Sequence, residues 1–369
     1  MKPGRSILVL AAVLVLGVSA ARTDEVPEKY RDTIRKGLDW LVKQQHKDGH
    51  WDVQTGQYPT AMTALAGMAL LMEGSTVREG KYSRNIRRAA DWLMEKSQRS
   101  GNRNGLIGNP DNPNEAARYM YGHGFGLLFL ASVFGDEEDR DRREKLRDIL
   151  TRAVKYCGDA QSSRGGWYYT SKAEGGDNDE GSVTITQVQA LRAARNAGIP
   201  VPKAVIKKAH DYLKDCTSPQ GAVYYSSRQR MERPAITAAA IACLFNAGEY
   251  KSELAKKWLQ YCRRTIPMGL GGPMGIRIGH DEYTHYYYSQ CIYILGDDGW
   301  EKLFPGTPKN ERLTWIAYRT ALFDQLLKTQ NADGSWPSGG GFSIGPVYST
   351  AIWCTVLQLD RGTLPIYMK

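Results

Sequence analysis

One turn motif occurs three times in this chain of 369 residues. Each copy has a glutamine, a glycine four residues later and a tryptophan two residues after that. The copies are Gln45, Gly49 and Trp51; Gln161, Gly165 and Trp167; and Gln330, Gly334 and Trp336. The glycine permits a sharp reversal after a helix, the tryptophan can cover the start of the next helix, and the glutamine can bond exposed backbone groups. The motif therefore predicts a repeated pair of helices joined by the same turn.

Three weaker copies of this turn complete the series. They follow stretches around Trp92, Tyr212 and Trp258 and reach their glycines near positions 105, 221 and 271. The period is about 50 to 63 residues, a size typical of a helical hairpin repeat. We therefore expect six hairpins.

The two helices of each hairpin differ in character. The first is charged and amphipathic, with apolar residues at spacings of three and four, so one face should be buried. These helices are expected at Val26–Gln45, Lys81–Gln98, Glu137–Cys157, Pro202–Cys216, Lys251–Arg264 and Asn310–Gln330. The second is nearly uncharged, as in Thr60–Met72, Ser182–Ala194, Ala235–Asn246 and Tyr348–Leu359. A helix that is apolar on all sides is buried on all sides. The sequence thus predicts an all-α fold, an (α/α)6 toroid with charged helices outside and apolar helices inside.

The repeated turn resembles the QW motif of terpene cyclases such as squalene–hopene cyclase. The six hairpins resemble the toroid that these cyclases share with protein prenyltransferase β subunits. The resemblance covers essentially all of the chain after residue 20. It implies a central cavity that holds an apolar or isoprenoid-like ligand, but the motif itself is structural and does not specify a reaction.

The first 20 residues are expected to be a signal peptide rather than part of the fold. Lys2 and Arg5 precede an apolar run from Ile7 to Val18, and small residues follow at Ser19 and Ala20. This run is shorter than the approximately 20 residues that span a bilayer. We expect residues 21–369 to form a single exported domain, in the periplasm or secreted. The net charge of +10 comes from basic residues interspersed with acidic ones, which favours a solvated surface over a nucleic-acid interface and leaves peripheral contact with anionic envelope surfaces open.

Aligning the inner helices places a polar residue at one repeat position of each. A ring of these residues and their neighbours would line a cavity around the toroid axis. The cavity-lining candidates are Tyr119, His123, Thr184, Gln187, Arg233, Thr237, His285, Tyr288, Thr350 and Trp353. The alternative is that these threonines cap or pack the helix starts.

An acidic segment precedes one inner helix and supplies the candidate catalytic residues Asp177, Asp179 and Glu180. It resembles the Asp-x-Asp-Asp group of hopene-type cyclases, whose middle aspartate protonates an alkene, but only after a shift of one residue. Such an acid must be kept protonated by its surroundings, and aromatic rings must stabilise the cation that follows. The alternative is an acidic cap at a helix N-terminus.

No metal or cofactor is expected. Asp281 and His285 would share a helix face, but Cys291 lies about 240° further round the helix and cannot complete a zinc triad of the prenyltransferase type. The six cysteines form no CxxC pair, and a disulfide between two of them is left open.

These observations leave several functions open. The first is a protein that binds an apolar or isoprenoid-like ligand, or binds and transforms it as a cyclase or transferase. The second is a non-catalytic binding or scaffold protein of the cell envelope. The third is a polysaccharide-active enzyme, which would require paired carboxylates, and Glu180 with Asp281 is the pair we can name.

Overall fold

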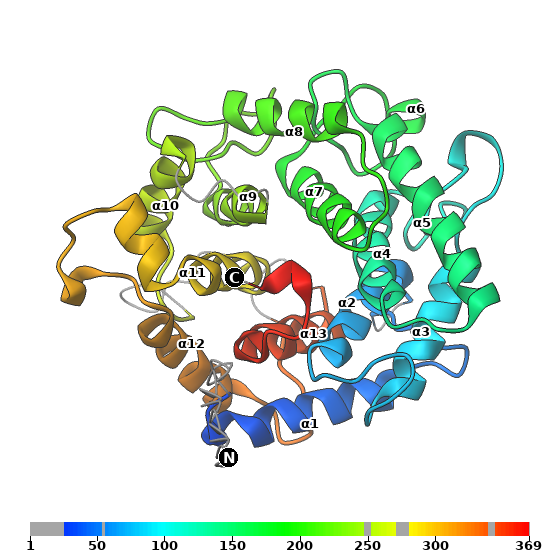
Figure 1. The fold of residues 1–369 in the computed structure, drawn as a ribbon, viewed down its shortest axis with the longest axis horizontal. Coiled ribbons are helices and arrows are strands. Elements are labelled where there is room, and N and C mark those ends of the chain that lie inside the picture. The colour runs from blue at the N-terminus through cyan, green and yellow to red at the C-terminus, as the bar shows by residue number, and fades with distance from the viewer. Residues whose placement is uncertain (1–25, 54–55, 247–251, 271–279, 339–343, 369) are drawn as a thin grey trace, which may run out of the picture.

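The computed structural model describes residues 26–53, 56–246, 252–270, 280–338 and 344–368. Six helices form an outer layer: α1 (Glu28–Gln44), α3 (Ser83–Glu95), α5 (Arg140–Ala160), α8 (Lys203–Asp215), α10 (Glu253–Thr265) and α12 (Trp315–Thr329). Six form an inner layer: α2 (Pro59–Leu71), α4 (Tyr119–Phe134), α7 (Gly181–Asn196), α9 (Pro234–Asn246), α11 (Asp281–Leu303) and α13 (Pro346–Leu357). Outer and inner helices alternate along the chain, so the predicted (α/α)6 toroid is confirmed (Figure 1).

The inner helices form a closed ring in which each contacts the next, and α13 returns to α2. The outer layer closes where α1 meets α12. A short helix, α6 (Lys172–Gly175), lies outside this pattern, and α11 breaks at Gly296, where the backbone turns to φ 56°. No helix in the described part of the chain is both long and apolar enough to cross a bilayer. The expected signal peptide, residues 1–20, lies outside the described residues.

The repeated turn ties three helices together. In the second full copy, the Gln161 side-chain amide donates to the carbonyl of Gly165 at 2.9 Å and to that of Val205 in the next outer helix at 3.0 Å. The Trp167 indole N–H donates to the carbonyl of Cys157, near the end of the preceding outer helix, at 2.7 Å. Gln45 with Trp51 and Gln330 with Trp336 make the corresponding bonds. Each motif therefore closes its own turn and holds the next hairpin.

The turn glycines are required for two reasons. Gly49, Gly105, Gly165, Gly221 and Gly334 all have φ between 91° and 108°, a region that favours glycine. A Cβ at any of them would also lie within 3.0 Å of a carbonyl oxygen in the next outer helix, as Gly165 would against Lys208. The glycines thus allow both the reversal of the chain and the close approach of neighbouring hairpins.

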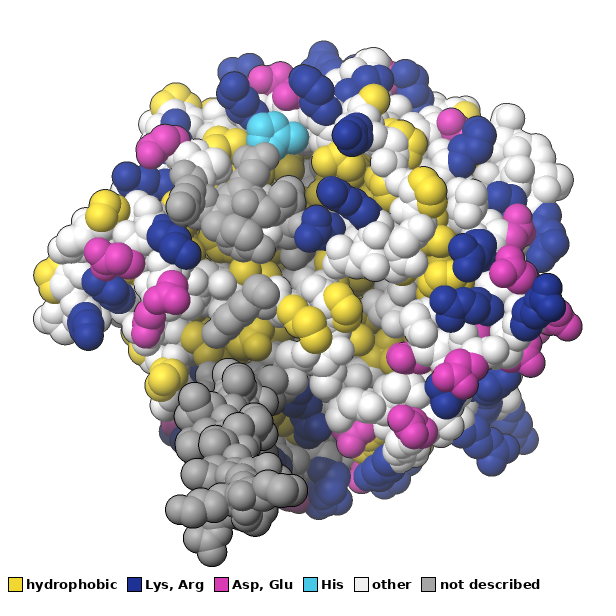
Figure 2. All heavy atoms as spheres, viewed as in Figure 1, with side chains coloured by type: hydrophobic (Ala, Val, Ile, Leu, Met, Phe, Trp, Pro, Cys, Tyr) yellow, Lys and Arg dark blue, Asp and Glu magenta, His cyan; other side chains and the backbone are white. Residues whose placement is uncertain are grey.

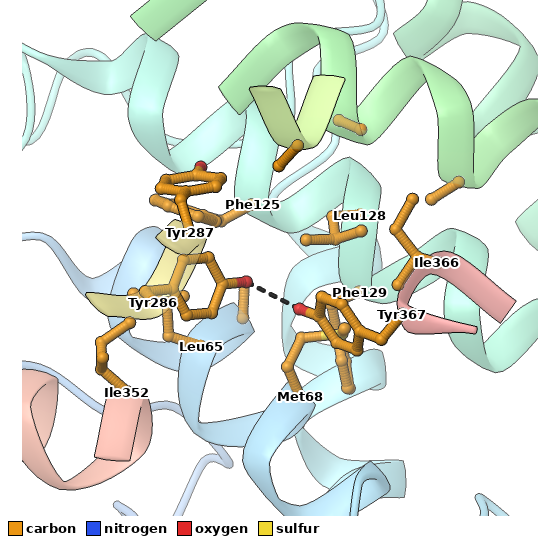
Figure 3. Close-up of a cluster of buried hydrophobic side chains, with 14 of the residues drawn as sticks. Leu65, Met68, Phe125, Leu128, Phe129, Tyr286, Tyr287, Ile352, Ile366 and Tyr367 are labelled. Atoms are coloured by element: carbon orange, nitrogen blue, oxygen red, sulfur yellow. Dashed lines mark hydrogen bonds between the residues drawn. The ribbon is translucent and has the colours of Figure 1, made fainter. Parts of the chain in front are cut away.

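The centre of the ring is packed with apolar and aromatic side chains. Leu65, Phe125 and Ile352 meet there from three inner helices (Figure 3). The C-terminal residues Pro365–Tyr367 turn inward to the middle of the ring, where the Tyr367 hydroxyl lies 2.7 Å from that of Tyr286 (Figures 1 and 3). Ile366 and Tyr367 are buried. The segment Pro365–Tyr367 therefore fills the axis beyond the point where α13 ends.

All six cysteines are buried and free, so the structure contains no disulfide between them. Burial raises the pKa of each thiol, that of Cys216 to about 12, and keeps these groups protonated at neutral pH.

Candidate functional site

The candidate site lies at the start of the inner helix α7. Glu180 is the N-cap of α7 and is 1% exposed. Its Oε2 accepts hydrogen bonds from the Ser182 hydroxyl at 2.6 Å and from the Val183 backbone N–H at 2.9 Å. Burial raises the pKa of Glu180, while these two donors act in the opposite direction. The carboxyl group is therefore held in place by its own helix start.

Four half-buried tyrosines lie within reach of the charge of this carboxyl group, and we call Tyr121, Tyr169, Tyr225 and Tyr283 the tyrosine mouth. Tyr121 shares a hydrogen bond with Ser182, which also bonds Glu180. The hydroxyls of Tyr169 and Tyr225 bond each other. Burial raises the pKa of all four tyrosines, and the charge of Glu180 raises it further. The tyrosine mouth is thus aromatic, its phenols are neutral, and the charge of the buried Glu180 acts on all four of them.

Two arginines flank the tyrosine mouth. The Arg118 guanidinium lies 4.5 Å from the ring centroid of Tyr169, and that of Arg233 lies 5.7 Å from the ring of Tyr225. Both are within cation–π range. Arg118 also acts on Glu180, where its positive charge lowers the pKa of the carboxyl group against the larger effect of burial. Over the face shown in Figure 2, basic and acidic side chains are interspersed.

The three acidic candidates do not converge. The Asp177 carboxylate is exposed and accepts a bond of 2.7 Å from the Ser163 backbone, and bonds from Ser163 lower its pKa to about 2. Asp179 is buried but faces elsewhere, with its oxygens bonded to Tyr212 at 3.0 Å and to Ser227 at 2.6 and 2.7 Å. Among these three acids, Glu180 is the one placed beside the tyrosines.

The residues that were expected to line a central cavity instead bond the turns that join the two helical layers. Thr184 Oγ1 accepts a hydrogen bond from the Trp167 backbone N–H. In the same way, Thr237 Oγ1 accepts from the backbone N–H of Val223, and Thr350 Oγ1 accepts from that of Trp336. In α4, the His123 Nδ1 takes the place of the hydroxyl and accepts a bond from Ile107. These side chains hold the turns from the inside.

The remaining cavity candidates also contact neighbouring helices. The Tyr119 hydroxyl bonds Ser171 and Glu174, and the Gln187 side-chain amide donates to the carbonyl of Met120. Among these remaining candidates, Arg233 is the one whose side chain contacts the tyrosine mouth. His285 Nδ1 lies 2.6 Å from the Tyr318 hydroxyl in the outer layer, where Tyr288 also packs, and Trp353 lies near His285. Cys291 donates to Ala238 O, so it does not join His285 in a metal site.

Sequence reasoning missed most of the tyrosine mouth. Tyr169 and Tyr225 each stand two residues after a residue whose N–H bonds an inner-helix threonine, so they share one repeat position. Aligning the turns as well as the helices would have placed them together.

Two buried histidines should make stability depend on pH. Burial lowers the pKa of His123 to about 3 and that of His285 to about 4, against about 6.5 in the unfolded chain. Stability from these groups is present above pH 6.5 and is lost as the pH falls toward their folded pKa values, by ~1.4 kcal/mol per pH unit for each histidine. Urea titrations between pH 7 and 4.5 measure this slope.

His123→Thr is the matched variant because threonine occupies this position in other repeats and keeps an acceptor for the turn. Its unfolding free energy should vary less with pH than that of the unmodified protein. Equal slopes in the two proteins would contradict the assignment of a buried neutral imidazole to His123.

Solved structures of two enzyme classes share this fold. The type II terpene cyclase MstE from Scytonema is 15% identical, with 91% of this chain and 98% of that chain covered and a TM-score of 0.57. An MstE variant in complex with geranylgeranyl dihydroxybenzoate, its substrate, is 14% identical, with 90% of this chain and 97% of that chain covered and a TM-score of 0.56. The α-1,6-mannanase GH76A of Salegentibacter sp. HEL1_6 is 9% identical, with 89% of this chain and 99% of that chain covered and a TM-score of 0.60. No family model and no curated protein matches the chain. The similarity establishes the toroid fold, which hosts more than one chemistry.

Proposed function

We propose that this protein binds an apolar, isoprenoid-like ligand at the tyrosine mouth, with Glu180 as the polar group that recognises it. The observation that carries the proposal is the position of Glu180, a buried acid whose charge acts on the four tyrosines of the tyrosine mouth. Ligand sites are commonly concave and aromatic with a few placed polar groups. The fold shared with MstE, which was solved with a geranylgeranyl compound, supports the same ligand class.

The hydrogen bonds of Glu180 favour binding over alkene protonation. Burial raises the pKa of Glu180, but both the Ser182 hydroxyl and the Val183 N–H donate to the carboxylate, and such donors stabilise the charged form against that effect. An acid that protonates an alkene must instead be stabilised in its neutral form. We therefore assign Glu180 to ligand recognition. Export of the protein belongs to the same proposal and rests on the signal-peptide character of residues 1–20.

Glu180→Gln tests the proposal because glutamine retains an acceptor for the helix cap while removing the charge. We expect the affinity for geranylgeraniol to fall by about 10- to 100-fold, since a hydrogen bond to a charged group contributes ~1.5–3 kcal/mol. Isothermal titration calorimetry on the full mature chain measures this change. Glu115→Gln is the matched control. Glu115 is also buried and bonds the start of α2, but its hydrogen bonds come from Thr60 and Asn109 rather than from the tyrosine mouth.

A second titration, with α-1,6-mannotriose, distinguishes the polysaccharide alternative. The inactive mannanase variant solved with this sugar has two adjacent aspartates changed to asparagine. The adjacent acids Asp179 and Glu180 face different partners here, so we expect no sugar binding or cleavage. Binding of mannotriose without binding of geranylgeraniol would overturn the isoprenoid proposal.

A further inference from the structure

The first full turn carries side chains that its structural role does not require. His46, His50 and Asp52 lie between α1 and α2 and bring one ligand atom each to within 4.8 Å of the others. His46 Nε2 lies 3.3 Å from one Asp52 oxygen, and His50 Nε2 lies 3.5 Å from the other. In a tetrahedral zinc site with bonds of about 2.0–2.2 Å, ligand atoms are about 3.3–3.5 Å apart. Each histidine therefore already lies at a ligand-to-ligand separation from one oxygen of the Asp52 carboxylate.

A second carboxylate orients one of these imidazoles. Asp48 Oδ1 lies 2.6 Å from His50 Nδ1, and Asp48 Oδ2 accepts a bond of 3.2 Å from the Trp92 indole N–H. The His50 ring also stacks on Trp92, with centroids 5.1 Å apart. A carboxylate on the far nitrogen fixes the tautomer and directs the other nitrogen toward a metal. This support places His50 Nε2 facing Asp52.

The other full turns show that the histidines are not needed to fold the motif. The backbone bond from residue 46 to residue 50 is 2.9 Å, and its equivalents, Ser162 to Gly166 and Asn331 to Ser335, have the same length. Serine, asparagine and glycine thus form the same turn at the positions where the first turn has histidine. Two of the six histidines of the chain are concentrated at these positions, which the turn itself leaves unconstrained.

Charge and exposure also suit a cation. The negative charges of Asp52 and Asp48 together balance a divalent ion when both imidazoles are neutral. His50 and Asp52 are 18% and 19% exposed, whereas His46 is 48% exposed, so its ring can rotate to complete the set. Three protein ligands on an accessible turn leave a fourth position for water or another donor.

We propose that His46, His50 and Asp52 bind a divalent transition-metal ion of the zinc class, with Asp48 as the positioning residue for His50. The inference is independent of the isoprenoid ligand. It differs from the sequence-based expectation that the chain binds no metal.

The test uses the full mature chain after treatment with EDTA. Titration with Co²⁺ should give the visible absorption of a tetrahedral site at one equivalent, and Zn²⁺ should displace it. The double variant His46→Asn, His50→Ser copies the last full turn, so it should fold normally and lose the absorption. Asp48→Asn should weaken binding about 10- to 100-fold. His210→Asn, at a remote surface histidine, should leave binding unchanged.

Two results would overturn the proposal. One is the absence of a Co²⁺ signal in the unmodified protein at millimolar metal. The other is a signal that persists in the double variant when circular dichroism shows that variant to be folded. Neither outcome depends on whether geranylgeraniol binds, so failure here and failure of the proposed function are distinguishable.

Discussion

Replacing Gly165 with alanine is expected to lower the free energy of unfolding by about 2–5 kcal/mol. The backbone at this residue has φ 96°, which costs an alanine ~1–2 kcal/mol. The new Cβ would also press against the Lys208 carbonyl oxygen in the next outer helix, and overpacking of this kind costs ~1–3 kcal/mol. Urea denaturation followed by far-UV circular dichroism measures the sum.

Gly198→Ala is the matched control for this experiment. Gly198 has a similar φ of 82°, but a Cβ there would meet nothing within 4 Å. This variant should therefore show the backbone cost alone, ~1–2 kcal/mol. Equal losses for Gly165→Ala and Gly198→Ala would show that close approach between hairpins is not what the turn glycine provides.

Trp167→Ala should destabilise the protein by about 3–5 kcal/mol, the usual cost of removing a large buried aromatic side chain. Trp167 is fully buried, and its indole N–H bonds the carbonyl of Cys157. Trp167→Phe retains much of the apolar surface but leaves that carbonyl without its donor, so a loss of ~1–3 kcal/mol is expected. The same denaturation experiment ranks the variants.

Ile316→Ala provides the baseline because Ile316 is 66% exposed. Its effect should stay within about 0.5 kcal/mol. A Trp167→Ala protein as stable as this control would mean that the tryptophan of the motif does not hold the hairpin together.

The layers and helix pairs were predictable from the sequence because the outer helices carry a clear polar face. The expected range Pro202–Cys216, for example, corresponds to α8 at Lys203–Asp215. The inner helices offer no such guide, since α13 is buried along nearly its whole length. Their apolar residues surround the helix, so the sequence does not indicate which side faces the axis.

The orientation of the inner helices shows this limit directly. Thr350, expected on the axis, bonds the turn at Trp336, while Ile352, two residues later, lies in the central cluster (Figure 3). His123 and Phe125 repeat the difference in α4. Two residues correspond to about 200° of rotation, almost the opposite face of a helix. The inward turn of Pro365–Tyr367 was also unforeseen, because it depends on contacts distant in sequence.

The glutamine of the last full motif bonds the first outer helix, just as the glutamines of the other two full motifs bond the outer helix that follows them. Gln330 donates to the carbonyl of Thr33 at 2.9 Å, and Tyr30 donates to Asp324 at 2.6 Å. Linear repeat proteins need special terminal repeats to protect their exposed ends, and they can unfold inward from those ends. Here every hairpin has a neighbour on both sides, so opening the structure at any point breaks an internal interface. The interface between the last and first hairpins is therefore of the same kind as the internal interfaces that the other two full motifs make.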